Sequence, residues 1–387
     1  MKKKLYLHIG MGKTGTTALQ NFFWENRKAL AKRDVCYPKR GTMANAHHLL
    51  SPHIPRFLEN EWNFQAVDEW APELAKSAQN RVLLSSELMA WAEESKARKF
   101  CAQVSAWFDV YVVIYLRRQD DIIMASYNQQ IKAGPQKRRV DLIYRKQVER
   151  FDYPKILAPW ADSLEPGKVI VRPYEKQQFH GGDIRHDFLR HAFQIDVDDS
   201  FAISNKDSNP RLPLNVSEYK RMVNCLVEDG RTNDHFNQLL VEFAAEQNAS
   251  STRELSTQSV LSPEQRIEII ELCRPDNAFV ASHYLERQNG CLFEDAEPSL
   301  DDSWDGIDLS SEDASHITDF LKGREPRLMR HLAQQIESFK DALAYQKRHS
   351  ARFLSRSVLG ETAASPVYRV AKEDSSPLVI GGVGGSG

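Results

Sequence analysis

The chain has 387 residues, enough for one large α/β domain with an appendage or for two smaller domains. Its 51 basic and 53 acidic residues nearly balance, so the overall charge gives no reason to expect a nucleic-acid partner. The apolar run after Lys4 stops at Gly10, too early for a signal-peptide core or a membrane span, and we expect a cytoplasmic protein. Five scattered cysteines without a C-x-x-C pair argue against a disulfide framework and against a zinc site.

Four apolar runs alternate with helical segments in the first half of the chain. The strands that we expect cover residues 4–9, 81–85, 110–116 and 168–174, and the third is continuously apolar, as in a strand buried on both faces. Apolar residues at helical spacing predict helices over 16–32, 120–133 and 183–193, the second with Asp120 or Asp121 as its N-cap. This alternation predicts an α/β fold with a parallel sheet flanked by helices, and the glycine-rich segment 7–17 after the first strand makes it a sheet of the P-loop type.

The chain is predicted to be mainly helical from about residue 216, so the fold gains a helical C-terminal part. A serine followed by a proline at 262–263 marks one helix start. Residues 294–313 are acidic and read as a solvated connector, and 314–350 again read as helical. We therefore expect a P-loop domain over 1–300, an acidic connector and helical extension over 301–355, and a linker over 356–376.

The segment "LHIGMGKTGTT", residues 7–17, places three glycines, a lysine and three threonines between a strand and a helix. Backbone N–H groups of such a turn converge on an anion, and the helix N-terminus adds partial positive charge. Nucleotide triphosphatases require lysine directly after the last glycine of G-x-x-x-x-G-K-[ST]. Here Gly10 and Gly15 keep the glycine spacing, but Lys13 precedes Gly15 and Thr16 follows it. The loop therefore predicts a phosphate site of a different kind from the ATP or GTP loop.

The hexapeptide "GKTGTT" resembles the 5′-phosphosulfate loop of bacterial sulfotransferase family proteins, which use 3′-phosphoadenosine 5′-phosphosulfate. The resemblance implies that this co-substrate is bound by the loop and that no metal is needed. The loop residues it points to are Gly12, Lys13, Thr14, Gly15, Thr16 and Thr17.

The same family holds the 3′-phosphate with an arginine just after a central strand and a serine eight residues later. Arg118 and Ser126 have this spacing after the strand at 110–116, and we give the adjacent Arg117 a supporting place. A guanidinium fork suits a phosphate dianion. The chain departs from the family pattern at Gln119 and Asp120, where Asn-Pro is common. The structural alternative is a capped helix with two surface arginines.

Sulfuryl transfer to a hydroxyl needs charge stabilisation on the leaving phosphate and a base for the acceptor proton. Lys13 is the candidate for the first role. Glu87 follows the strand at 81–85, where the family carries its catalytic base, although the residue could equally be a helix-start acid. His47 and His48 are the rivals, with His48 as the second catalytic candidate.

The sequence gives weaker indications for the residues that surround the nucleotide and for those that bind the acceptor. In the loop "SNKDSNPRL", Arg211 is a candidate to close on the nucleotide, against the alternative of an ordinary solvent loop. The basic stretch 133–150 could receive an acidic acceptor or form a solvated helix. We expect a hydroxyl-bearing acceptor, with a glycan as one candidate.

Two other functions stay open at this point. A P-loop kinase would use ATP, with Glu87 assisting magnesium, but the displaced lysine and the missing aspartate after "VYVVIYL" oppose it. The second open function is a nucleotide-binding module that has no catalytic activity and belongs to a larger protein.

The last residues, "PLVIGGVGGSG", repeat the layout of the first loop: Gly382, Gly384 and Gly387 align with Gly10, Gly12 and Gly15. We expect residues 377–387 to begin a second P-loop domain that continues beyond residue 387. The alternative is a flexible glycine tail.

Overall fold

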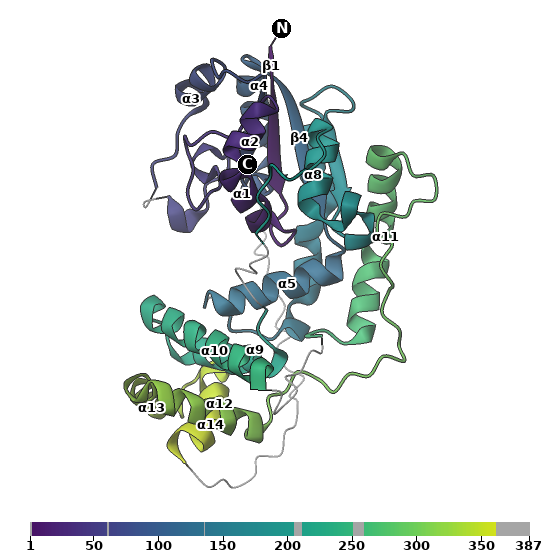
Figure 1. Cartoon of the computed structure of the whole chain (residues 1–387). Coiled ribbons are helices and arrows are strands. Elements are labelled where there is room, and N and C mark those ends of the chain that lie inside the picture. The colour runs from purple at the N-terminus through teal and green to yellow at the C-terminus, as the bar shows by residue number, and fades with distance from the viewer. Residues whose placement is uncertain (1, 60–61, 135, 205–210, 251–258, 361–387) are drawn as a thin grey trace, which may run out of the picture.

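The computed structural model describes residues 2–59, 62–134, 136–204, 211–250 and 259–360 (Figure 1). Its centre is a five-stranded, all-parallel sheet in the order β2-β3-β1-β4-β5. The strands are β1 (Lys3–Gly10), β2 (Val35–Cys36), β3 (Arg81–Ser85), β4 (Phe108–Leu116) and β5 (Val169–Pro173). The α/β fold class with a parallel sheet and the four expected strands are confirmed, and β2 is a two-residue strand that the sequence pattern did not indicate.

Helices cover both faces of the sheet, as the side-chain alternation of β1 requires. Leu5, Leu7 and Ile9 enter one apolar core, whereas Tyr6 points to the other face. The Tyr6 face is covered by α1 (Thr16–Glu25), α2 (Arg27–Lys32) and α8 (Ile184–Phe193). The opposite face is covered by α3 (Val67–Leu74), α4 (Glu94–Ser105), α7 (Tyr153–Ala161) and α11 (Pro263–Leu285).

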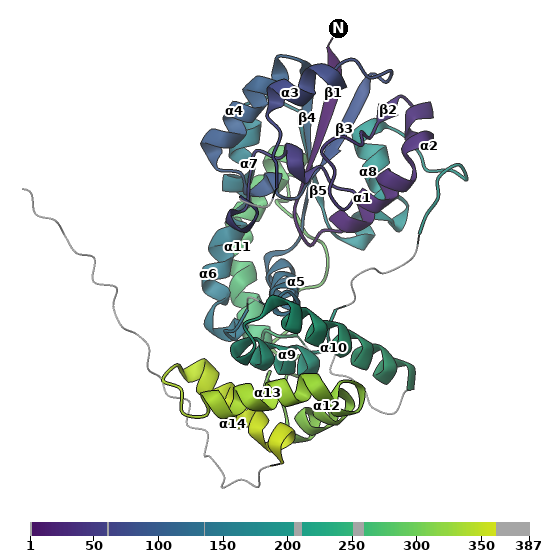
Figure 2. The same ribbon diagram turned by 90° about the vertical axis from the view of Figure 1, so that its left-hand side faces the viewer.

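Two helices lead from the sheet toward the rest of the molecule (Figure 2). α5 (Gln119–Lys132) begins directly after β4 and ends beside the C-terminal helices, and the short α6 (Tyr144–Val148) packs next to it. Arg118 is the N-cap residue of α5, so Asp120 and Asp121 lie in its first turn instead of capping it. The helix start expected at 262–263 is confirmed, because Ser262 and Gln265 form a capping box in front of α11.

The helical C-terminal part has an apolar core of its own (Figure 2). It contains α9 (Leu214–Leu226), α10 (Gly230–Ser250), α12 (Ser311–Arg324), α13 (Pro326–Phe339) and α14 (Tyr345–Leu359). Helices from before and after α11 thus share one core, although the sequence analysis assigned 214–250 and 311–355 to different regions. The linker expected over 356–376 starts inside α14, and its residues from 361 onward lie outside the described residues, as does the second loop expected at 377–387.

α9 is the joint between this unit and the sheet domain. Nearly all of its residues are buried, including the charged Glu218, Lys220 and Arg221. Glu218 and Arg221 pair with each other at 2.7 Å, and Lys220 Nζ is surrounded by oxygen acceptors. Burial of charges on a single helix is compensated by these local partners.

Among the described residues, no helix has both the length and the apolar composition that a membrane crossing needs.

Candidate active site

The carboxyl ends of four parallel strands meet at one edge of the sheet. β1 ends at the glycine-rich loop, β3 at Glu87, β4 at Arg117 and β5 at Tyr174. β1 lies between β3 and β4; the connection that follows β1 runs toward β2 at one edge of the sheet, whereas the connection that follows β3 runs the opposite way, past β1, to β4. Such a switch point is where open α/β sheets bind ligands. The structure therefore brings the predicted loop, Lys13 and Glu87 to one place.

The loop has the backbone shape of an anion cradle. Lys13 and Gly15 both have positive φ, 69° and 72°, and Gly15 is the N-cap of α1. The N–H groups of the first turn of α1, beginning at Thr16 and the exposed Thr17, have no intrahelical acceptor. Thr14 has a structural role, because its buried hydroxyl donates to the Met11 carbonyl at 2.6 Å.

Gly15 has a packing role besides its conformation. A side chain at this position would come within 3.2 Å of the Tyr174 ring and 3.1 Å of Ile184. The loop is thus pressed against α8 and the end of β5. Gly12, by contrast, has open space where a side chain would stand.

Lys13 is half-buried, and its ammonium group donates to Oε1 of Gln129 on α5 at 3.1 Å. Burial lowers the pKa of Lys13, and the nearby negative charge of Glu87 opposes this shift. The amine is therefore partly withdrawn from solvent and held by Gln129.

Glu87 lies against the start of the loop. A side chain at Gly10 would stand 3.2 Å from the Glu87 backbone, so glycine allows this close approach. The Glu87 carboxylate accepts a hydrogen bond from Gln20 of α1, with Nε2 and Oε2 2.8 Å apart. Glu87 stands in an irregular segment after β3, in front of a short 3₁₀ helix (Met89–Trp91).

The two adjacent histidines have different environments. His47 is fully buried and bridges the Pro38 carbonyl, at 2.9 Å, and the Ser85 N–H, at 3.1 Å. Burial lowers the pKa of His47 to about 4, so it is a neutral structural residue. His48 is half-buried, with Nδ1 2.8 Å from Ser86 Oγ. Burial lowers its pKa too, and the negative charge of Glu87 opposes the shift.

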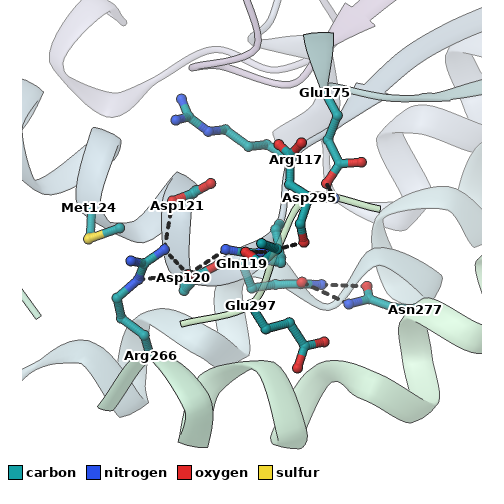
Figure 3. A network of polar contacts seen from close by, with 12 residues as sticks. Arg117, Gln119, Asp120, Asp121, Met124, Glu175, Arg266, Asn277, Asp295 and Glu297 are labelled. Atoms are coloured by element: carbon teal, nitrogen blue, oxygen red, sulfur yellow. Dashed lines mark hydrogen bonds and ion pairs between the residues drawn. The ribbon is translucent and has the colours of Figure 1, made fainter. Parts of the chain in front are cut away.

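The arginine pair after β4 is divided between two tasks. Arg118 is buried: its Nε donates to Asp120 at 2.8 Å, and its Nη1 donates to the carbonyls of residues 295 and 296, both at 3.0 Å. Asp120 also accepts from Arg266 of α11 (Figure 3). Arg117 points away from this network (Figure 3), lies over the Tyr174 ring at 5.6 Å and reaches the Lys13 carbonyl at 3.3 Å. Of the two arginines, Arg117 is the one whose guanidinium meets the loop.

The segment that Arg118 binds is fixed from its other side by Glu175. Its carboxylate accepts from the backbone N–H groups of residues 294 and 295 at 2.7 and 3.1 Å. Asn277 pairs with Gln119 through two amide hydrogen bonds. Glu175 and Asn277 thus have structural contacts in this network.

Two further predicted residues lie near this region. Ser126 is half-buried on α5, three residues before Gln129, which contacts Lys13. Arg211 is exposed as a residue, yet its guanidinium is close to Arg117: burial of this group and the positive charge of Arg117 both lower the pKa of Arg211. Among the described residues, no three His, Cys, Asp or Glu side chains converge as metal ligands would.

Three site residues escaped the sequence analysis: Gln20, Gln129 and Tyr174. None of them belongs to a recognisable motif: the two glutamines lie within helices, and the tyrosine directly follows a strand. Only their contacts with Glu87, Lys13 and Arg117 mark them, and those contacts join residues 67, 116 and 57 positions apart along the chain.

Comparison with known proteins gives limited similarity. No family model matches the chain. An uncharacterized protein of Archaeoglobus fulgidus is 26% identical over 186 residues, which is 48% of this chain, and the match spans about half the length (49%) of that relative. The crystal structure of a sulfotransferase from Alicyclobacillus acidocaldarius aligns with 73% of this chain and 96% of its own, at a TM-score of 0.39 and 13% identity. Neither similarity assigns an activity to this chain.

Proposed function

We propose that this protein is a sulfotransferase that moves a sulfuryl group from 3′-phosphoadenosine 5′-phosphosulfate to a hydroxyl acceptor, a carbohydrate being the first class to test. The observation that carries the proposal is the meeting of three groups at one sheet edge. A lysine-bearing anion loop, a carboxylate and an arginine come from the ends of β1, β3 and β4. A donor with phosphate groups at both its 5′ and 3′ positions requires such a pair of cationic sites.

The residues fit an in-line displacement. The acceptor oxygen forms a bond to sulfur while the bond from sulfur to the 5′-phosphate oxygen breaks. Glu87 takes the acceptor proton, and the negative charge that develops on the leaving phosphate faces Lys13 and the free N–H groups at the start of α1. Lys13 and Glu87 follow neighbouring strands, β1 and β3, at the same edge of the sheet, which supports this assignment of roles.

For the 3′-phosphate, the contacts favour Arg117 over Arg118. The hydrogen-bonding groups of Arg118 bind Asp120 and the carbonyls of residues 295–296. Arg117 has a cation–π contact with Tyr174 and one hydrogen bond to the loop, and Arg211 stands close to it. We propose Arg117 as the phosphate ligand, with Arg118 holding the helix start, and Ser126 and Arg211 as secondary ligands.

The test is a titration followed by a transfer assay. Calorimetry with 3′-phosphoadenosine 5′-phosphate should give tight binding without magnesium, and ATP with magnesium should bind at least tenfold more weakly. Labelled donor incubated with a panel of hydroxyl compounds, read by mass spectrometry, should then yield a sulfated product. Preferential, magnesium-dependent binding of ATP would overturn the proposal in favour of a kinase.

A further inference from the structure

We propose that Gln20 is a positioning residue that fixes the Glu87 carboxylate for catalysis; this inference rests on the proposed function. Gln20 belongs to α1, the helix that begins in the anion loop, and its side chain is only 3% exposed. Its amide Nε2 donates to Glu87 Oε2 at 2.8 Å. The helix that supports the loop therefore also holds the proposed base.

Gln20 is itself anchored by a buried row of polar groups. Its Nε2 also lies 3.3 Å from Ser85 Oγ, and Ser85 Oγ lies 2.8 Å from His8 Nδ1. Ser85 and His8 are fully buried in the sheet. Because polar groups in an apolar core are costly without partners, this row holds the Gln20 amide in a single orientation.

The row contains no charge that competes with Glu87 for the amide. Burial lowers the pKa of His8 to about 3, so its ring is neutral at physiological pH. Serine and glutamine do not titrate in this range. His8, Ser85 and Gln20 therefore keep their protonation states across the neutral range.

Fixing Oε2 leaves Oε1 as the oxygen that can accept the acceptor proton. A glutamate side chain without a partner samples several rotamers, and Glu87 stands in a turn outside any strand or α-helix. A misplacement of about 1 Å can cost about 10²-fold in rate. The amide also keeps the base at a fixed distance from the loop that carries Lys13.

The first variant is Gln20→Leu, which keeps helix propensity and approximate volume but removes the amide. We expect kcat to fall about 10- to 100-fold, with the Kd for 3′-phosphoadenosine 5′-phosphate unchanged within about twofold, because the loop itself is intact. An unchanged kcat would overturn the proposal.

The second variant, Gln20→Glu, separates positioning from simple packing. At pH 8 two carboxylates would face each other and activity should be below that of Gln20→Leu. As the pH falls toward 6, the pair takes up one shared proton and the donor is restored, so activity relative to wild type should rise. A constant ratio of variant to wild-type kcat across this range would contradict the role of Gln20 as a donor.

Asn26→Leu is the matched control. Asn26 is a buried amide at the end of the same helix, and it bonds the backbone of residues 22 and 202. This variant should lose as much thermal stability as Gln20→Leu while keeping kcat. If both variants lost the same amount of kcat, Gln20 would have a structural role only. If the wild-type protein transferred no sulfate at all, the proposed function and this role of Gln20 would both be overturned.

Discussion

At the scale of single residues, Glu87 and His48 are the two groups that could take the acceptor proton. Burial lowers the pKa of His48, and the negative charge of Glu87 opposes this shift. Gln20 orients Glu87, whereas His48 is oriented by Ser86. Glu87 is packed against the start of the loop, since a Cβ at Gly10 would lie 3.2 Å from its Cα and Cβ atoms.

We therefore expect Glu87→Gln to lower kcat by about 10²- to 10⁴-fold without changing donor binding. His48→Asn keeps a side chain that can bond Ser86 and should lower kcat less than about tenfold. Steady-state kinetics with a labelled donor, together with calorimetry, separates the two effects. The reverse ranking would identify His48 as the base.

The neighbouring arginines give a second prediction at this scale. Arg117→Ala should weaken binding of 3′-phosphoadenosine 5′-phosphate by about 1.5–3 kcal/mol, the range for hydrogen bonds to charged groups, with little effect on unfolding. Arg118→Ala leaves a buried carboxylate with fewer partners and should destabilise the fold by about 3 kcal/mol. Calorimetry and urea denaturation measure the two quantities. If Arg118→Ala abolished binding in a protein of normal stability, the expectation from the sequence would hold instead.

This pair also shows where sequence reasoning ends. The loop could be predicted because glycine spacing, an apolar strand before it and a helix after it are all local. The division of labour between Arg117 and Arg118 could not, because it depends on a tyrosine at the end of β5 and on carbonyls 177 and 178 residues away. Gln20 had no sequence signal, since its partner is 67 positions further on.

At the scale of elements, α8 is tied to the sheet through Asp187. This fully buried carboxylate accepts hydrogen bonds from Arg172 of β5 at 2.8 and 3.0 Å and from Tyr115 of β4 at 2.7 Å. Burial alone would raise the pKa of Asp187, but hydrogen bonds from His191, Arg172 and a backbone N–H outweigh it and hold the pKa well below its usual value.

Asp187→Asn should therefore destabilise the protein by about 3–5 kcal/mol, because Arg172 would be left as a largely buried cation without its counter-ion. The lowered pKa means that Asp187 contributes stability above its ordinary pKa near 4, and this contribution is lost as the pH falls toward the native value. Denaturation at pH 7 and at lower pH checks both points. Asp196→Asn, an exposed partner of Arg190, is the control and should cost less than about 1 kcal/mol.

Helix ends also differ in how far the sequence predicts them. Ser262, Pro263 and Gln265 are a local signature, and α11 starts where they indicate. The segment expected as one helix over 16–32 is divided at Asn26, whose side chain bonds both backbone groups of residue 202. No pattern near Asn26 indicates that distant partner.

At the scale of the whole molecule, Lys220 lies where the sheet domain meets the helical unit. Its Nζ is 2.5 Å from Asn224 Oδ1 and 3.4 Å from the carbonyl of Ile131, at the end of α5, and it also donates to Asn233. Burial lowers the pKa of Lys220 to about 8. The native state thus binds fewer protons than the unfolded chain between this value and the ordinary pKa near 10.5.

Stability should consequently rise with pH between 8 and 10.5, and Lys220 contributes up to about 3 kcal/mol to this rise. Lys220→Met should lose this part of the pH dependence, measured by urea denaturation at half-unit steps. Lys322→Met, at an exposed site, should keep it. A parallel pH dependence of the wild type and Lys220→Met would contradict the prediction.

The core shared by α9, α10 and α12–α14 has a practical consequence for anyone who divides this gene. A fragment that ends at residue 300 would contain α9 and α10 but not α12, α13 and α14, which complete the core around Phe236 and Leu240. Such a fragment would expose the apolar residues of this core to solvent, and we expect it to aggregate during purification. A fragment for expression should therefore keep these five helices together or leave out all of them, and the acidic stretch is the wrong place to divide the chain.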